Sequence, residues 1–156
     1  MLIRDYQRGD AAALADLRYR AVHALAANDY TPEQLSAWQP EPESECDAHR
    51  RYTDQRRAFV AEAPDGSLMG VTDLQADGHI DTLYVHPDYA GRGVATALLQ
   101  HVERVAVQAG MARLYTEASA TACPSFAADG FIVTHRRDFV NNGVALFNFV
   151  MEKSLA

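Results

Sequence analysis

Long apolar runs, cysteine and metal-ligand patterns are what this sequence has least of. No run approaches the ~18 apolar residues of a membrane span, and residues 1–5 lack the apolar core of a signal peptide. The two cysteines, Cys46 and Cys123, and the six scattered histidines stand in no metal-ligand spacing. We therefore expect a cytoplasmic protein with reduced thiols, no membrane association and no metal.

Positive charge is also scarce. The chain carries 14 Lys and Arg against 21 Asp and Glu, a formal net charge of −7. A nucleic-acid surface needs clustered Lys and Arg, so we expect no nucleic-acid partner, and the acidic balance mildly favours a cationic or neutral one. The length of 156 residues and the apolar fraction of 48% indicate a single domain over residues 1–156.

What the sequence does have is a glycine-rich turn between an apolar strand and a long helix, over residues 81–99. Pro87 ends the strand, Gly91 and Gly93 let the backbone approach a bound group, and apolar residues from Val94 onward recur at helical spacing. The first N–H groups of a helix have no partner within it, and the macrodipole makes that end positive. The turn is therefore a predicted phosphate or pyrophosphate site, although the same glycines would also suit a tight corner.

Two common phosphate-binding motifs are absent from this turn. A Walker A loop needs Gly-Lys-Ser/Thr, and a Rossmann fingerprint needs a third small residue where this chain has Thr96. Residues 90–95 instead resemble the pyrophosphate loop of the GNAT superfamily, the acyl-CoA-dependent N-acyltransferases, whose pattern is Gln/Arg-x-x-Gly-x-Gly/Ala. Gly93 and Ala95 match that pattern, and Ala90 departs from it.

A second resemblance to the same family lies further along the chain. Residues 119–131 fit the pattern Asn-x-x-Ala-x-x-x-Tyr-x-x-x-Gly-Phe, with its Ala, Gly and Phe positions matched. Ser119 stands at the Asn position, where its hydroxyl is expected to bond the pantetheine arm. Phe126 replaces the Tyr that often protonates the departing thiolate. Residues 30–38 and 143–151 resemble the YafP-like branch of the superfamily.

The resemblance implies acetyl-CoA as co-substrate and direct transfer of its acetyl group to an amine in a ternary complex. It also implies where the cofactor binds: on the strand before the loop, on the loop and helix start, and on the second motif. These cofactor-binding candidates are Leu83, Tyr84, Val85, Gly91, Arg92, Gly93, Val94, Ala95, Thr96, Ser119, Ala122 and Phe126.

Acyl transfer to an amine needs a proton acceptor, a donor to the oxyanion and an exit for the thiolate. The backbone N–H near Val85 is the oxyanion candidate, because the family's central strand splays from its neighbour there. Asp81 and His79 are the candidate bases, on the same face of the expected strand; an edge-capping Asp and a solvated His are the plainer alternatives. Ser125 and two strand tyrosines are candidate proton donors to a thiolate that is acidic enough to need none.

The acceptor side is less defined. Tyr30 and Trp38, with His23 nearby, are candidates to line a pocket between the first helices and the sheet, although packing of two short helices explains them equally well. The leading hypothesis is an N-acetyltransferase acting on a small-molecule or protein amine. The alternative is a module that binds or senses acyl-CoA without transferring it, and the apolar C-terminal hairpin suggests a possible homodimer.

Hydrophobic periodicity, caps and turns predict an alternating order of strands and helices. That order matches the GNAT fold, an α+β fold with a mixed, mostly antiparallel sheet of about seven strands flanked by helices. The expected strands are 2–5, 58–63, 68–75, 79–86, 114–118, 131–140 and 144–151, and the expected helices follow Asp10 and Thr31 and cover 44–55, 94–109 and 121–129.

Overall fold

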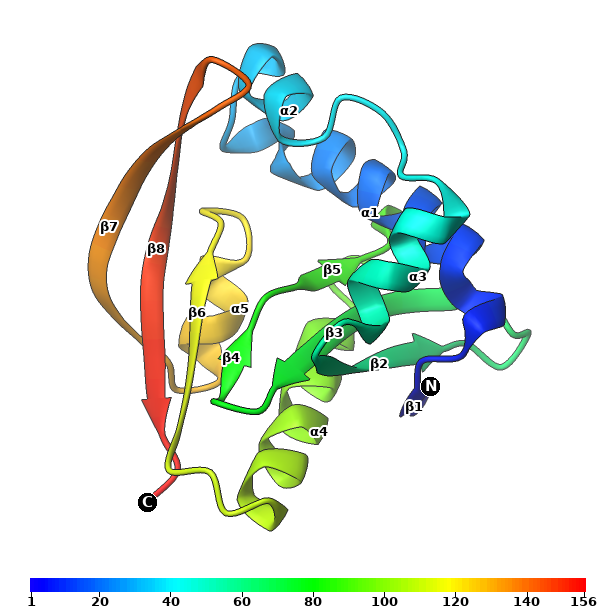
Figure 1. The fold of residues 1–156 in the computed structure, drawn as a ribbon, viewed down its shortest axis with the longest axis vertical. Helices are drawn as coiled ribbons and strands as arrows, with labels where there is room; N and C mark the ends of the chain where they lie inside the picture. Colours follow the sequence, from blue (N-terminus) through cyan, green and yellow to red (C-terminus); the bar gives the residue numbers. More distant parts are fainter.

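Two four-stranded sheets lie next to each other and diverge at one end, as the computed structural model of residues 1–156 shows (Figure 1). The first sheet has the order β1-β2-β3-β5, all antiparallel, and the second has the order β4-β6-β8-β7, with only β4 and β6 parallel. The strands are β1 (Leu2–Asp5), β2 (Arg56–Glu62), β3 (Leu68–Gln75), β4 (His79–Ile80), β5 (Leu83–Val85), β6 (Arg113–Ala118), β7 (Ile132–Asn141) and β8 (Val144–Ser154).

Helices cover both faces of the first sheet. The α-helices are α1 (Ala11–Leu25), α2 (Pro32–Trp38), α3 (Glu45–Thr53), α4 (Val94–Gln108) and α5 (Cys123–Ala128), with short 3-10 turns at Arg8–Asp10, Ala26–Asn28 and Pro87–Tyr89. Strand alternation decides which helix each residue meets. On β2, Val60 packs in a cluster with Leu14 and Leu17 of α1, whereas Phe59 packs in a cluster with Leu99 of α4.

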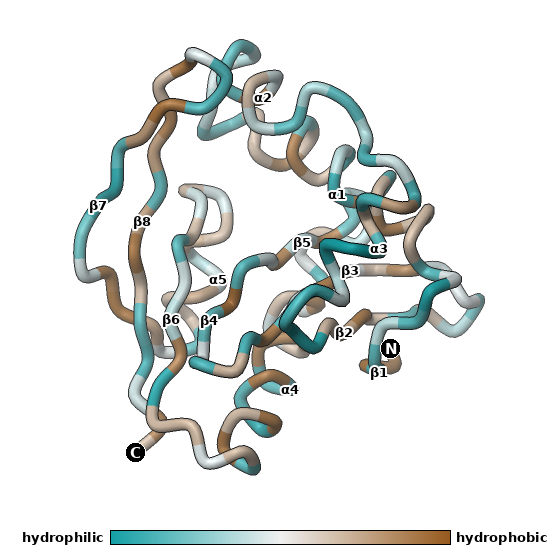
Figure 2. The backbone as a smooth tube through the Cα atoms, in the orientation of Figure 1, coloured by the Kyte–Doolittle hydropathy of each residue, from teal (hydrophilic) through white to brown (hydrophobic).

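The local signals for helices were accurate where caps were strong. Thr31 Oγ1 accepts from the Gln34 N–H at 3.2 Å, and Gln34 Oε1 accepts from the Thr31 N–H at 3.0 Å, so the expected capping box starts α2. Helix α3 is largely hydrophilic in Figure 2 and buries only Ala48 and Tyr52. The predicted helix over 121–129 is shorter in the structure, Cys123–Ala128.

The central strand expected over 79–86 was wrong as a continuous element. Its first half, β4, pairs with β6 in the second sheet, and its second half, β5, pairs with β3 in the first. Between them, the buried carboxylate of Asp73 accepts from the Asp81 N–H at 2.8 Å and the Thr82 N–H at 3.1 Å. A side chain thus takes the backbone bonds that a neighbouring strand would need. The break separates the two sheets and gives eight strands instead of about seven.

Candidate active site

The free edge of β5 faces the gap between the two sheets. On its other edge β5 pairs with β3, in the register Gly70 to Val85, and no strand covers the side towards β6 (Figure 1). The His86 N–H donates to Met69 O at 2.8 Å. Because hydrogen-bonded pairs alternate along an antiparallel ladder, the N–H groups of Leu83 and Val85 point away from β3, towards the gap.

A second row of free amides lies at the start of α4. None of the N–H groups of residues 91–96 donates to a protein acceptor, Gly93 has no side-chain cap, and the first bond of the helix runs from the Ala97 N–H to Gly93 O at 3.0 Å. Gly91 and Gly93 have φ of +74° and +79°, and a Cβ on either would meet nothing within 4 Å. Backbone conformation therefore favours glycine at both positions, and no protein atom lies within 4 Å of where a Cβ would be.

One cleft, of about 390 Å³, connects both sets of amides. Its walls come from α1, β5, the start of α4 and the segment that leads into α5. The lining residues are Ala21, Val22, Leu25, Ala26, Trp38, Leu83, Tyr84, Val85, Tyr89, Ala90, Gly91, Gly93, Val94, Ala95, Thr96, Ser119, Thr121, Ala122 and Ser125. Ten of the twelve cofactor-binding candidates thus lie on this cleft, and so does Ser125.

The other two candidates lie elsewhere. Phe126 is 2% exposed and packs edge-on against Phe131, with ring centroids 5.1 Å apart, so it lies in the core instead of on the cleft wall. It is Ser125, the residue before it, that reaches the cleft. The Arg92 guanidinium lies over the ring of Tyr89, 5.6 Å from its centroid.

A second pocket, of about 220 Å³, adjoins the cleft and is called the acceptor pocket below. Trp38, Tyr84 and Ser119 line both cavities, so the two meet at these residues. The acceptor pocket is lined by Arg18, Tyr30, Trp38, Arg51, Asp81, Thr82, Tyr84, Glu117, Ser119, Arg137, Phe139, Asn141, Leu146, Phe147 and Asn148.

The three acceptor-side candidates have different surroundings. Trp38 lines both cavities, and Tyr30 is a buried member of the pocket wall whose hydroxyl donates to Phe147 O and accepts from the Ala120 N–H, both at 2.9 Å. His23 lines neither cavity: its Nε2 lies 2.6 Å from the backbone oxygen of Gln39. Tyr30 therefore holds the hairpin β7–β8 against the start of α5 as well as lining the pocket.

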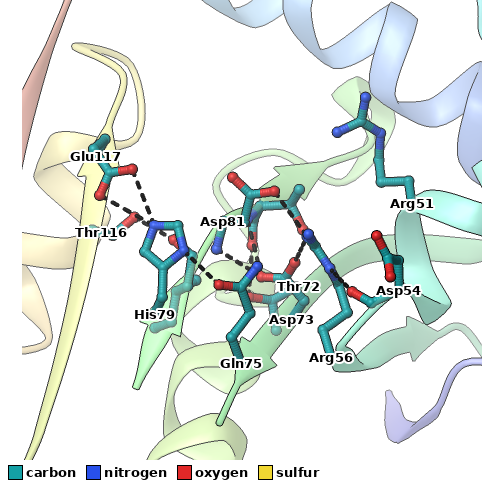
Figure 3. A network of polar contacts seen from close by, with 12 residues as sticks. Arg51, Asp54, Arg56, Thr72, Asp73, Gln75, His79, Asp81, Thr116 and Glu117 are labelled. Carbon is teal, nitrogen blue, oxygen red and sulfur yellow. Dashed lines mark hydrogen bonds and ion pairs between the residues drawn. The ribbon is translucent and has the colours of Figure 1, made fainter. Parts of the chain in front are cut away.

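Asp81, one of the two candidate bases, is held in an ion pair (Figure 3). Arg56 Nη1 lies 2.8 Å from the Asp81 carboxylate and 2.5 Å from that of Asp73. Burial favours a higher pKa for Asp81, but the hydrogen bond and charge of Arg56 more than offset it, so the pKa of the Asp81 carboxyl is lowered. A carboxylate with a lowered pKa is a weak proton acceptor.

His79, the other candidate, is paired with a residue that sequence patterns did not single out. Its Nε2 lies 3.0 and 3.1 Å from the two carboxylate oxygens of Glu117, and its Nδ1 lies 3.0 Å from Gln75 Oε1 (Figure 3). The hydrogen bond to Glu117 raises the pKa of His79, against the lowering effect of burial. Glu117, and not His79, lines the acceptor pocket.

Other parts of the pocket were also missed from the sequence. Arg18 of α1, Arg137 of β7 and Thr82, between β4 and β5, also line it, and none of the three stands in a motif. For Glu117 one signal existed: along β6, Leu114, Thr116 and Ala118 are buried, and the alternate residues Tyr115 and Glu117 lie on the other, half-buried face. Only the pairing of β4 with β6 shows which partner that face meets.

No helix of this structure combines the length and the apolar character that a membrane crossing requires. Three or more His, Cys, Asp or Glu side chains nowhere come together in a way that could hold a metal ion.

Comparison with known proteins agrees with this geometry. The model of the acetyltransferase (GNAT) domain matches residues 26–153. The uncharacterised N-acetyltransferase YafP of Escherichia coli is 32% identical over 149 residues, which is 96% of this chain and 93% of that protein. A crystal structure of a GCN5-related N-acetyltransferase from Rhodopseudomonas palustris is 35% identical, with a TM-score of 0.90 over 98% of this chain and 94% of that one.

A more distant neighbour, yncA of Salmonella typhimurium, a putative acetyltransferase solved with acetyl-CoA, shares the fold at 20% identity. Its TM-score is 0.76, over 99% of this chain and 94% of that one. The family model and these two relatives each cover most of the sequence. The chain therefore belongs to the GNAT family of acyl-CoA-dependent N-acetyltransferases.

Proposed function

We propose that this protein moves an acetyl group from acetyl-CoA directly to the amine of an acceptor bound in the same complex. One observation carries the proposal: a continuous path leads from the free amides of residues 91–96, along the free edge of β5, to a second pocket of different character. A thioester lying along that path has its reacting end where the cleft meets the acceptor pocket.

The cofactor would be held mainly by backbone groups. The positive start of α4 and its unpartnered amides suit the diphosphate. The pantetheine arm would run along β5 between Val85 and Ser119, and the Val85 N–H would donate to the thioester oxygen as negative charge develops on it. One such donor contributes about 10²–10³ in rate. Because backbone amides do this binding, the departure at Ala90 from the family pattern costs little.

For the proton of the amine, we propose the pair formed by Glu117 and His79. Glu117 lines the acceptor pocket, and His79, hydrogen-bonded to it, can in turn accept the proton. Asp81 also lines the pocket, but its ion pair with Arg56 makes it the weaker acceptor. The amine nitrogen then bonds the carbonyl carbon, the carbon–sulfur bond breaks, and the thiolate leaves; Ser125 on the cleft wall is the proposed proton donor to it.

Release of free thiol from acetyl-CoA over a panel of amines tests this function. We expect thiol release to depend on an amine and to match, one to one, the acetylated amine found by mass spectrometry. The alternative is a module that only binds acyl-CoA. One observation favours it: Phe126 stands where the family often has a Tyr that donates a proton to the thiolate. Tight binding of acetyl-CoA without amine-dependent release would support that alternative and contradict transfer.

A further inference from the structure

Three arginines, Arg18, Arg51 and Arg137, line the acceptor pocket together with two carboxylates, Asp81 and Glu117. Arg18 Nη1 and Arg51 Nε both bond the same oxygen, Glu43 Oε1, at 2.5 and 2.7 Å. Arg137 donates from Nε to the neutral Asn148 Oδ1 at 3.1 Å, and its guanidinium has no carboxylate partner. Arg18 and Arg51 thus share one carboxylate, and Arg137 is left without a carboxylate partner beside the pocket.

Two buried polar atoms of the pocket residues lack any hydrogen-bond partner. They are Arg18 Nε and Thr82 Oγ1. Thr82 is 4% exposed, and the Arg18 side chain is 11% exposed. Buried donors are normally satisfied, so an exception points to a missing partner. The Arg18 guanidinium also lies over the ring of Tyr84, 5.6 Å from its centroid, which fixes it beside the junction of the two cavities.

Negative charge lies on the side of the pocket next to the β4–β5 break. Asp81 follows β4, and Glu117 comes from β6, across the gap (Figure 3). These carboxylates suit an amine close to the thioester path. Three aromatic side chains, Trp38, Phe139 and Phe147, also line the pocket. This lining fits a molecule with an amine, an anion and an apolar body.

We propose that the acceptor is a free α-amino acid with an apolar side chain, or an amino carboxylate of similar size. Its amine lies towards Glu117 and Asp81, and its carboxylate towards Arg18 and Arg137. The inference rests on the proposed function and names its acceptor. A polyamine has no anion for the arginines, and a lysine within a protein has no free carboxylate beside its amine. The pocket volume of about 220 Å³ suits a single small molecule.

Matched pairs of acceptors test the class. Each apolar L-amino acid is compared with its own carboxamide, with spermidine as the cationic rival, by thiol release and product mass at saturating acetyl-CoA. We expect kcat/KM to be at least 10-fold higher for the acid than for its amide. The amine of the carboxamide is less basic, so a larger fraction of it is unprotonated and reactive at neutral pH. Amine protonation alone would therefore favour the amide, and it cannot explain a preference for the acid. Equal or better turnover of the amide or of spermidine would overturn the inference and leave acetyl transfer standing.

A variant pair locates the anion subsite. Arg137→Gln removes a charge that lines the pocket, and Arg136→Gln removes the neighbouring charge on β7, which does not line it. We expect Arg137→Gln to raise KM for the amino acid about 10-fold, with KM for the amide and for acetyl-CoA unchanged, and Arg136→Gln to change none of them. If both variants behave like the wild type, or if both acceptors weaken together, the carboxylate is not bound by Arg137 and the assignment fails.

A second variant guards against a fold effect. Arg18→Lys keeps the positive charge near Glu43 but lacks the guanidinium Nε donor. We expect a higher KM for the amino acid and an unchanged KM for acetyl-CoA, with the thermal midpoint followed in parallel. If no amine of any class releases thiol from acetyl-CoA, the proposed function fails first and the inference fails with it.

Discussion

The two cavities that meet at Trp38, Tyr84 and Ser119 are built in different ways. The cofactor cleft offers backbone N–H groups from two short stretches close in sequence, 83–85 and 91–96. The acceptor pocket offers side chains from α1, α2, α3, β6, β7 and β8. A site made of amides depends on backbone conformation and tolerates changes of side chain, whereas a site made of side chains changes its specificity with almost any substitution.

The largest effect is expected at the amide site. In Gly93→Asp the new residue is of a type that tolerates φ near +79° and caps helices well. It also places a carboxylate where the diphosphate would lie. We expect affinity for CoA to fall by at least about 100-fold by calorimetry, because the added carboxylate would repel the diphosphate at its proposed site.

The matched control for that change is Gly110→Asp at the other end of α4. Gly110 has the same φ of +79°, and a Cβ there also meets nothing within 4 Å. This variant bears the same backbone demand far from the cleft, so its CoA affinity should equal that of the wild type. An unchanged affinity in Gly93→Asp would refute the amide site.

The next effect belongs to the side-chain site. Glu117→Gln keeps the shape of the side chain but removes the carboxylate that lines the acceptor pocket. A positioned base contributes typically 10²–10⁴ in rate, so we expect kcat to fall by about 100-fold or more while CoA affinity stays unchanged. Glu152→Gln on β8, an exposed position outside both cavities, is the control. If Glu117→Gln turns over at the wild-type rate, Glu117 and His79 are not the proton acceptor.

The pH dependence sharpens the same assignment. The hydrogen bond to Glu117 raises the pKa of His79 above its ordinary value of about 6.5. Only the unprotonated pair can accept a proton, so kcat/KM should be lost as the pH falls through that raised pKa and should level off above it. In Glu117→Gln the limb should move to lower pH. If the acidic limb of the pH profile instead shifts with the pKa of the acceptor amine, the titrating group is the substrate amine and not the Glu117–His79 pair.

The smallest effect is expected at Phe126. Phe126→Tyr restores the residue that the family often has, but Phe126 is 2% exposed, packs in the core and does not line the cleft. Turnover should stay within about twofold of the wild type. The buried hydroxyl should lower the free energy of unfolding by about 1–3 kcal/mol, measured by urea denaturation. A clear gain in turnover would show that the ring reaches the thiolate.

Sequence predicted the fold and the glycine-rich turn before α4 well because both depend on local signals. Each such signal is set by residues that are close together in the sequence. Examples are the capping box of α2, the turn at Gly91 and Gly93, and the strand patterns. The break between β4 and β5 was missed because its cause, Asp73, lies on a neighbouring strand.

The acceptor pocket was mostly missed for the same reason. Its charges come from segments as far apart as Arg18 and Arg137, and no periodicity shows that they meet. The overall charge of −7 favoured a cationic or neutral partner, whereas the pocket itself contains Arg137, which has no carboxylate partner. Net charge describes the whole surface and does not describe one cavity.

Asp73 has a role that reaches beyond its own hydrogen bonds. This one buried carboxylate accepts hydrogen bonds from the Asp81 and Thr82 N–H groups, where β4 ends and β5 begins. The chain breaks there, so β5 does not pair with β6 and the two sheets stay separate. The free edge of β5 therefore keeps unpaired N–H donors that face the gap. A flexible, amide-bearing arm such as pantetheine can then dock as strand-like backbone would, without any part of the protein having to unfold first.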